Sequence, residues 1–288
     1  MMSITNHRLQ ISEPKASLDF YLNKLGMLLI SQYEIDNKHH YFLSFSDNQD
    51  ACLELVFAHD TVFSVQSQPS LTEGYWKYSI AVPNLRLARE HLISQGINIG
   101  SPFEVKNIAY LCHFTDPDGY CIELIQHYFT NNSRKRLSSS SSFQECLPTL
   151  NLSTLRVKQI DESLAFYTKL GMRLVSRQKV ESRNMHLYFL SFNMESPPSS
   201  DIDSLRVREW LWQRPYTLLE LQHTDGIESE IGFKYRTSTS SGFLGLDMNI
   251  LKNLPSNVVG KETEFLVSSG KVTGVALNDP DGYQLRCF

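Results

Sequence analysis

Asp279-Pro-Asp-Gly-Tyr283 repeats an earlier stretch of the chain, Asp116-Pro-Asp-Gly-Tyr120, with the same five residues in the same order. Proline at the second place fixes φ, and glycine at the fourth tolerates a positive φ, so each stretch favours a tight turn. An apolar, strand-like run follows each turn, Cys121 to Ile125 after the first and Gln284 to Phe288 after the second. Two copies of one turn-and-strand unit indicate that the chain contains a duplicated structural unit.

The residues upstream of each turn show a recurring order of predicted elements: strand, helix, strand, strand, strand. In residues 5–58, Ser12 is the expected cap of an amphipathic helix with Pro14 in its first turn, and three strand-like runs follow it. Residues 75–127 repeat the order, with Asn84 as the cap of their helix. Residues 150–223 follow the same order again, and residues 242–288 parallel the second unit, although Pro255 would cut their expected helix short, so the sequence predicts four related units.

Matches between the two halves of the chain support this duplication. Leu164, Phe166 and Tyr167 match Leu18, Phe20 and Tyr21 at an offset of 146 residues. Tyr188-Phe-Leu-Ser-Phe192 matches Tyr41-Phe-Leu-Ser-Phe45, and Leu219-Glu-Leu221 matches Leu53-Glu-Leu55. The matches keep their order along the chain, which is typical of a true internal repeat.

We therefore expect two tandem domains joined by a linker. The first covers residues 1–128, with modules at about 5–58 and 75–127, and the second covers residues 149–288, with modules at about 150–223 and 242–288. Residues 129–148 lie between them and contain the basic run Arg134-Lys-Arg136 and five consecutive serines at 138–142. This composition is too polar to form a core and is typical of a linker.

Composition excludes several classes of function. Of the 288 residues, 41% are hydrophobic and 20% charged, which is an ordinary globular balance. A net charge of -4 argues against a nucleic-acid partner, and no apolar run approaches membrane-spanning length, so no membrane partner is expected. The five cysteines form no CxxC pair and fit a reducing compartment. We expect a cytoplasmic protein.

The second half of the chain carries the most specific motifs. They are Leu155-Arg-Val157, Ser163-Leu-Ala-Phe-Tyr-Thr168, Leu170-Gly-Met172, Tyr188-Phe-Leu190, Arg208-Glu-Trp210, Leu219-Glu-Leu-Gln-His223 and the Asp-Pro-Asp-Gly-Tyr turn. In this order they resemble the vicinal oxygen chelate superfamily and, within it, glyoxalase I, also called lactoylglutathione lyase. The resemblance covers nearly the whole chain apart from the linker.

The resemblance implies an α+β fold of tandem vicinal oxygen chelate domains, in which four βαβββ modules form curved mixed sheets around clefts. A tandem of this kind is similar to duplicated glyoxalase I chains, in which one polypeptide replaces a homodimer. A duplicated chain satisfies the interface of the dimer internally, so we expect a monomer that contains a pseudo-dimer.

The resemblance also implies a metal site. In glyoxalase I a zinc or nickel ion, held by four side chains, polarises a hemithioacetal of glutathione and a 2-oxoaldehyde, and a ligand glutamate moves a proton through an enediolate. The ligand positions of the family fall on Asn6, Glu54, Lys77, Glu123, Leu152, Glu220, Gly245 and Arg286.

How these positions group depends on which modules pair. Pairing as in a duplicated glyoxalase gives one set of Asn6, Glu54, Gly245 and Arg286 and another of Leu152, Glu220, Lys77 and Glu123. Pairing within each half gives Asn6, Glu54, Lys77 and Glu123, and separately Leu152, Glu220, Gly245 and Arg286. Under either pairing a fixed cation faces carboxylates, and such a cation would repel a metal. We therefore predict internal salt bridges and no metal cofactor, and nickel or zinc only if this argument fails.

Four residues are candidates for function. Glu123 and Glu220 are the candidate catalytic acid and base, and a salt bridge with Lys77 is the alternative role for both. Lys77 itself is a candidate substrate-binding residue. Arg156 matches an arginine that binds a glutathione carboxylate in the family, which makes glutathione a candidate cosubstrate. Thr224 and Ser241 stand where the family places an asparagine and an arginine for that ligand.

Two hypotheses from different classes follow, both with a small-molecule partner. The protein is a glyoxalase I-like isomerase with one functional cleft around Glu123, Glu220 and Arg156, although its degenerate ligand positions argue against isomerase activity. The alternative is a metal-free protein of the bleomycin-resistance type that binds or sequesters a small molecule. Lys77 and Gly245 at the histidine position of the family favour the second.

Overall fold

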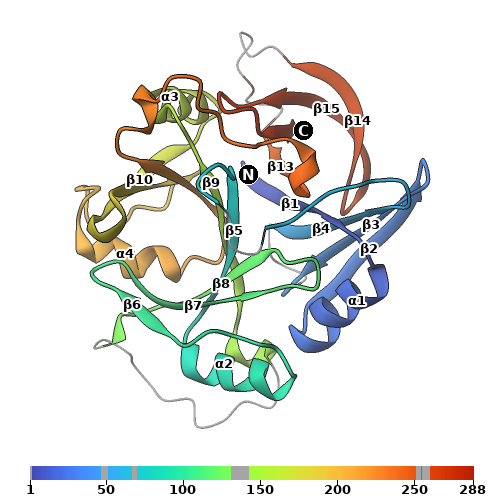
Figure 1. Ribbon diagram of the computed structural model, residues 1–288, viewed down its shortest axis with the longest axis horizontal. Coiled ribbons are helices and arrows are strands. Elements are labelled where there is room, and N and C mark those ends of the chain that lie inside the picture. Colours follow the sequence, from blue (N-terminus) through green and yellow to red (C-terminus); the bar gives the residue numbers. More distant parts are fainter. Residues whose placement is uncertain (1, 47–50, 67–69, 131–142, 251–253, 255–259) are drawn as a thin grey trace.

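The structure is a computed structural model that describes residues 2–46, 51–66, 70–130, 143–250, 254 and 260–288. It contains two curled, eight-stranded mixed sheets with few helices (Figure 1), so the predicted α+β fold is confirmed. Residues 131–142, the centre of the predicted linker, lie outside the described part. No described helix is long and apolar enough to cross a membrane.

The first half of the chain supplies two βαβββ modules. The first consists of β1 (Ser3–Ile11), α1 (Pro14–Leu18) with a π-helical continuation (Asp19–Lys24), β2 (Leu28–Ile35), β3 (Lys38–Ser44) and β4 (Cys52–Ala58). The second consists of β5 (Tyr75–Val82), α2 (Leu85–Ser94), β6 (Phe103–Val105), β7 (Ala109–Thr115) and β8 (Cys121–Gln126). Asn84 caps α2 as expected, because its side chain accepts a hydrogen bond from the backbone N–H of Leu87.

The second half supplies two more modules. The third consists of β9 (Thr149–Arg156), α3 (Ile160–Lys169), β10 (Arg173–Val180), β11 (Met185–Ser191), α4 (Leu205–Trp212) and β12 (Leu218–Thr224). The fourth consists of β13 (Phe243–Asn249), β14 (Lys261–Val267), β15 (Gly270–Asn278) and β16 (Gln284–Cys287). The helix α4 lies between β11 and β12, in an insertion that the first module lacks between β3 and β4.

Each sheet takes four strands from each half of the chain. One sheet has the order β14-β15-β16-β13-β1-β4-β3-β2, and the other has the order β10-β11-β12-β9-β5-β8-β7-β6. The first and fourth modules join through the antiparallel pair β1–β13, and the second and third through β5–β9. The modules therefore pair as in a duplicated glyoxalase, and Figure 1 shows the blue N-terminal strands beside the red C-terminal strands.

The two Asp-Pro-Asp-Gly-Tyr turns fasten one sheet to the other. Asp116 accepts hydrogen bonds from the backbone N–H groups of Asp118 and Tyr120 and from the hydroxyl of Tyr21, which lies in the π-helical segment of the first module. Asp118 accepts from the backbone N–H and the hydroxyl of Ser12. The expected capping role of Ser12 is therefore wrong: its side chain binds the turn, and the Glu13 side chain caps α1 instead.

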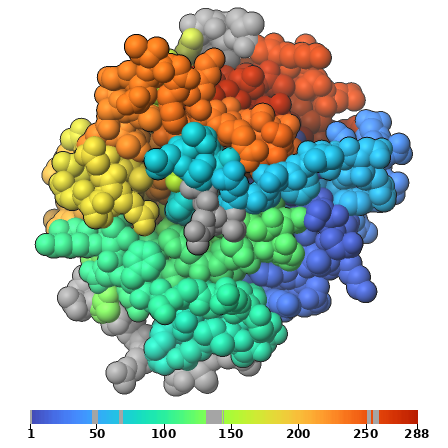
Figure 2. Space-filling model, viewed as in Figure 1, coloured from blue at the N-terminus to red at the C-terminus, as the bar shows by residue number. Residues whose placement is uncertain are grey.

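The second turn repeats these contacts. Asp279 accepts from the Tyr167 hydroxyl at 2.8 Å, and Asp281 accepts from the backbone N–H of Lys158 at 3.0 Å. The loop between β4 and β5, cyan in Figure 2, crosses the face of the molecule and meets the orange C-terminal segment there. Glu73 of this loop binds the guanidinium of Arg236 at 2.7 Å. Arg236 lies between β12 and β13, so the loop also ties the two halves together.

Candidate functional site

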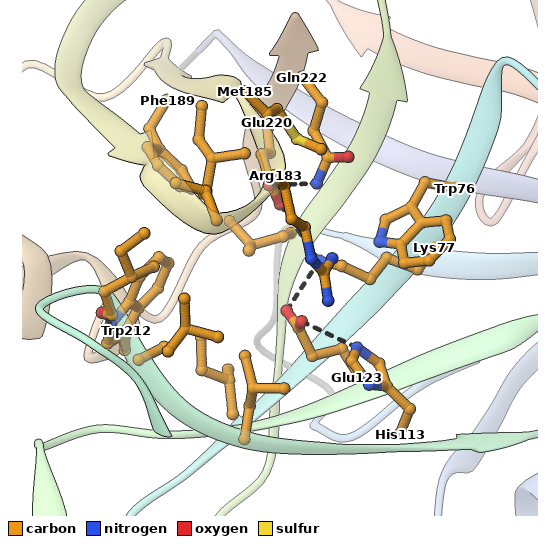
Figure 3. Close-up of a pocket in the computed structure, with 18 of the residues that line it drawn as sticks. Trp76, Lys77, His113, Glu123, Arg183, Met185, Phe189, Trp212, Glu220 and Gln222 are labelled. Carbon is orange, nitrogen blue, oxygen red and sulfur yellow. Dashed lines mark hydrogen bonds and ion pairs between the residues drawn. The ribbon is translucent and has the colours of Figure 1, made fainter. Parts of the chain in front are cut away.

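The sheet that runs from β6 to β10 holds a pocket with about 540 Å³ of empty space, its open mouth included (Figure 3). Most of its lining is apolar and includes Phe103, Ile108, Leu152, Leu187, Phe189 and Trp212. The polar lining consists of Lys77, His113, Glu123, Arg183, Glu220 and Gln222. The pocket therefore has an apolar chamber and one polar wall, a combination typical of small-molecule sites.

Lys77 lies at the centre of the polar wall and binds both predicted glutamates. Its Nζ is 2.8 Å from Oε1 of Glu123 and 3.2 Å from Oε2 of Glu220. Lys77 comes from β5, Glu123 from β8 and Glu220 from β12, so the site is built from both halves of the chain. All three side chains are almost fully buried, which means that their charges meet little competing water.

Two hydroxyl groups and two further polar side chains complete the hydrogen bonding. Ser79 donates to Oε1 of Glu123 at 2.8 Å, and Thr154 donates to Oε2 of Glu220 at 2.7 Å. Gln222 donates to the other oxygen of Glu220 at 2.8 Å, and His113 Nε2 lies 3.2 Å from the other oxygen of Glu123. Every carboxylate oxygen of the pair therefore has a partner.

These contacts set the protonation states. Burial by itself would raise the pKa of Glu123, but the Lys77 ammonium and His113 outweigh it and hold that pKa far below its usual range. Burial likewise lowers the pKa of Lys77, and the two glutamates overcome this effect and raise it. Lys77 and Glu123 are consequently a stable ion pair at neutral pH.

The residues at the family's ligand positions do not fit a divalent metal ion. A lysine ammonium occupies the space between the two carboxylates, and Leu152, the fourth member of the set, carries no donor atom. Zinc and nickel need several lone pairs directed at one point, which an ammonium cannot supply. Among the residues that the structure describes, no group of three or more His, Cys, Asp or Glu side chains could hold a metal ion.

The other sheet carries an ion-pair cluster at the corresponding place, formed by Arg8, Glu54, Asp247 and Arg286. Arg286 lies 2.7 Å from Glu54 and 2.5 Å from Asp247, and Arg8 lies 3.1 Å and 3.6 Å from the same two carboxylates. His40 Nδ1 lies 2.8 Å from the second oxygen of Glu54. Both carboxylates have no exposed surface, so the cluster is part of the core.

Sequence reasoning found part of this cluster. It placed Asn6 with Glu54 and Arg286, and the Asn6 amide does donate to Asp247 at 2.6 Å, but it missed Arg8 and Asp247. Strand residues two apart share a face, so Arg8 and Asp247 point the same way as the residues that were chosen. A search of the alternate positions for charged residues would have found both.

Gly245 cannot supply a metal ligand, because the backbone at this position leaves no room for a side chain. Its φ is +108°, and a Cβ there would lie 2.0 Å from the carbonyl oxygen of Gln284 on the neighbouring strand. Only glycine fits such a close approach. The position of the family's histidine is therefore closed to any side chain in this sheet.

Arg156, the predicted carboxylate-binding residue, does not line the pocket. One of its Nη atoms donates to the backbone oxygens of Ser70 at 2.6 Å and Glu73 at 3.1 Å, and its guanidinium lies 4.7 Å over the ring of Trp76. Trp76 lines the pocket, so Arg156 lies behind one of its walls. These contacts hold the arginine in place and support the indole.

The other two residues expected beside a glutathione carboxylate are separated from each other. Ser241 precedes β13, which belongs to the sheet of the ion-pair cluster, while Thr224 ends β12 in the sheet of the pocket. The backbone oxygen of Glu73 already accepts a hydrogen bond from Arg156, and the Glu73 carboxylate is paired with Arg236.

The helix α4 has a packing role. Trp212 donates from Nε1 to the backbone oxygen of Ile108 at 3.1 Å, and its ring meets Phe189 edge-on at 5.4 Å. Arg208 donates to the backbone oxygen of Asn107. Since Asn107 and Ile108 belong to the second module, α4 clamps the third module onto it. Sequence reasoning did not anticipate that Trp212 also forms a wall of the pocket.

Comparisons with known proteins agree with this geometry. Residues 4–124 match the sequence model of the Glyoxalase/Bleomycin resistance protein/Dioxygenase superfamily. The chain is 25% identical to glyoxalase I of Saccharomyces cerevisiae over 98% of its own length and 91% of that protein. It is 24% identical to lactoylglutathione lyase of Schizosaccharomyces pombe over 96% of its length and 93% of that protein.

The crystal structure of glyoxalase I from Zea mays has the same fold. It superposes with a TM-score of 0.69 and 18% sequence identity, over 100% of this chain and 92% of the maize chain. The likeness therefore extends through both sheets and all four modules. The chain is a member of the Glyoxalase/Bleomycin resistance protein/Dioxygenase superfamily, with the tandem vicinal oxygen chelate fold of glyoxalase I.

Proposed function

We propose that the protein binds an amphipathic small molecule in the pocket and needs no metal ion to do so. The observation that carries this proposal is the Lys77 ammonium between Glu123 and Glu220 at one wall of an apolar pocket of about 540 Å³. The ammonium stands where the family places its metal, and it leaves the apolar chamber free. The chamber supplies affinity by burying apolar surface, and the polar wall orients the ligand.

The same contacts argue for binding over catalysis. A general base works best with a pKa near the working pH, and Glu123 is held ionised by Lys77 at a pKa far below that range. Lys77 has a raised pKa, so it carries no free lone pair for nucleophilic attack at neutral pH. Neither Glu123 nor Lys77 is tuned for proton transfer from carbon.

The surroundings of Arg156 argue against glutathione as a cosubstrate. Its guanidinium is engaged by the backbone oxygens of Ser70 and Glu73 and by the face of Trp76. A glutathione carboxylate would have to displace these contacts. We therefore assign Arg156 to the architecture of the pocket.

Binding can be tested with a neutral apolar dye, N-phenyl-1-naphthylamine, whose fluorescence rises in apolar sites. Met185 lies at the pocket and is half-buried, so the Met185→Trp variant should fill the chamber and abolish dye binding. The matched control is Met194→Trp, since Met194 is 72% exposed and does not line the pocket. Equal dye binding by wild type and both variants would overturn the proposal.

A glyoxalase I-like isomerase is the second candidate, because the relatives that match almost the full chain carry the names glyoxalase I and lactoylglutathione lyase. The test is the formation of lactoylglutathione from methylglyoxal and glutathione, with and without added nickel or zinc. We expect no rate above the uncatalysed reaction. A metal-dependent rate, or stoichiometric nickel or zinc in protein purified without chelator, would refute the metal-free proposal.

A further inference from the structure

The two sheets present the same four positions with different charges. In the ion-pair cluster, Arg8 lies opposite Glu54 in the β1–β4 register, and Asp247 lies opposite Arg286 in the β13–β16 register. In the pocket, Thr154 lies opposite Glu220 and Ser79 lies opposite Glu123. The internal repeat makes Thr154 the counterpart of Arg8 and Glu123 the counterpart of Arg286.

The ion-pair cluster is balanced, and the wall of the pocket is not. In the cluster, the guanidinium groups of Arg8 and Arg286 meet the carboxylates of Glu54 and Asp247, two charges of each sign. In the pocket, Glu123 and Glu220 share the single ammonium of Lys77. The buried wall of the pocket therefore sets two carboxylates against one fixed cation.

The residue that would supply the second cation is missing from the pocket. Arg8 provides it in the cluster, and its counterpart Thr154 is uncharged and short. Arg183 also lines the pocket, but its side chain is exposed, so water screens its charge.

The cluster also shows how a cation is held in such a place. The Arg286 guanidinium binds two carboxylates and lies 4.9 Å from the ring centre of Phe265, so that acids and an aromatic face surround it. The pocket offers the same kinds of group in Glu123, Glu220 and Trp76. Charged groups pair when buried, and the ligand is the partner available here.

We propose that the ligand of the pocket is an organic cation whose ammonium or amidinium group points to Glu123 and Glu220 while its apolar body fills the chamber. This assignment rests on the proposed binding function and names its ligand class. It follows from the charge difference between the two sheets.

The experiment compares three probes that share a phenyl ring and a three-carbon chain: 3-phenylpropylammonium, 3-phenylpropan-1-ol and 3-phenylpropanoate. Displacement of N-phenyl-1-naphthylamine from the full-length wild-type protein gives the affinity of each. We expect the ammonium to bind at least about tenfold more tightly than the alcohol, because its hydrogen bonds to the carboxylates are charge-assisted. The carboxylate should bind most weakly.

Two variants and one control test whether the missing cation causes the preference for the ammonium. Thr154→Arg restores the cation that Arg8 supplies in the other sheet, so it should abolish the preference for the ammonium. Thr154→Gln, which is polar but uncharged, is the control and should keep the preference. Glu220→Gln removes the excess negative charge and should bring the ammonium-to-alcohol ratio close to one. Circular dichroism and urea unfolding check that each variant folds.

The outcomes separate this inference from the proposed function. If all three probes displace the dye equally, or the carboxylate binds best, the pocket binds small molecules and the cation assignment is wrong. An unchanged ammonium-to-alcohol ratio in both Thr154→Arg and Glu220→Gln also refutes the assignment. If neither the dye nor any probe binds the wild-type protein, the proposed function itself fails.

Discussion

His7 and Ser153 occupy equivalent positions in the two halves of the chain, 146 residues apart, and their side chains meet, with Nδ1 of His7 2.7 Å from Oγ of Ser153. Nε2 of His7 lies 3.0 Å from the hydroxyl of Tyr75. The position was expected to face away from the ligand sites, and the ring is buried among aromatic residues between the two sheets. It is a core contact between the halves.

This contact predicts a loss of stability in acid. Burial lowers the pKa of His7 from 6.5 to about 3, so the unfolded chain takes up a proton there that the folded protein refuses. The stabilising effect is complete above pH 6.5 and is lost as the pH falls toward 3. Across that range it amounts to on the order of 4 kcal/mol. Urea unfolding between pH 7.5 and 4 measures it.

The matched variant is His7→Gln, whose amide can bond to both Ser153 and Tyr75 and does not titrate. We expect it to unfold about 1–2 kcal/mol more easily at pH 7.5 and to show a pH slope smaller by up to one proton. A variant with the wild-type slope would show that other groups cause the acid sensitivity.

Lys77 is the second test, through its role between two buried acids. The Lys77→Met variant leaves Glu123 and Glu220 without their cation, and it should lose about 3–5 kcal/mol of unfolding free energy at neutral pH. Adding Glu123→Gln and Glu220→Gln to that variant should recover part of the loss, because neutral amides do not repel each other. Failure of the triple variant to recover any stability would argue against the charge explanation.

A third prediction concerns metal binding. Replacing Lys77 by His and Leu152 by Gln in one protein removes the ammonium and supplies two donor atoms beside Glu123 and Glu220. We expect the Lys77→His/Leu152→Gln variant to bind nickel or zinc with a stoichiometry close to one, measured by elemental analysis after dialysis. The control is the same treatment of Leu152→Gln alone, in which Lys77 should still exclude the ion.

Arg156 provides a fourth test, which distinguishes a wall-supporting residue from a ligand contact. Arg156→Ala removes the cation over Trp76 and the bonds to Ser70 and Glu73, so N-phenyl-1-naphthylamine, which has no charge, should bind several-fold more weakly. A direct ligand contact would predict no change for an uncharged dye. Arg86→Ala, whose side chain is exposed on α2 and does not line the pocket, is the control and should leave the affinity for the dye unchanged.

The ion-pair cluster gives a fifth prediction. Burial alone would raise the pKa of Glu54, but the two arginines and His40 lower it to about 2, so its stabilising effect is complete above its ordinary value of 4.5 and is lost as the pH falls toward 2. Arg286→Met should cost about 3–5 kcal/mol at neutral pH and leave dye affinity unchanged, because the cluster lies in the other sheet. Weaker dye binding in a folded Arg286→Met protein would contradict this separation.

The sequence determines the fold well because its signals are local and repeated. The two Asp-Pro-Asp-Gly-Tyr turns, the helices after the first three opening strands and the alternating runs are each visible within about ten residues. The helix α4 was harder to predict, since propensities in short stretches are weak. The pairing of the modules could not be read at all, because it depends on contacts such as Ser3 with Asn249.

The site was predictable in part. Lys77, Glu123 and Glu220 follow from the resemblance to glyoxalase I, and the structure brings them together. Arg8 and Thr154 did not stand out, since each is an ordinary residue until the strand opposite it is known. The role of Arg156 changed because its partners are backbone oxygens of a loop, which carry no signal in the sequence.

The exchange of strands between halves bears on how the chain folds during synthesis. When the first half has left the ribosome, β1 and β5 each present an unpaired edge, and their partners β13 and β9 come later in the chain. An unpaired edge is prone to join other chains. β9 covers β5 soon after the linker, whereas β1 waits for nearly the whole protein. The unpaired edge of β1 therefore remains the longest-lived hazard for aggregation, and a chain truncated before β13 would keep it permanently.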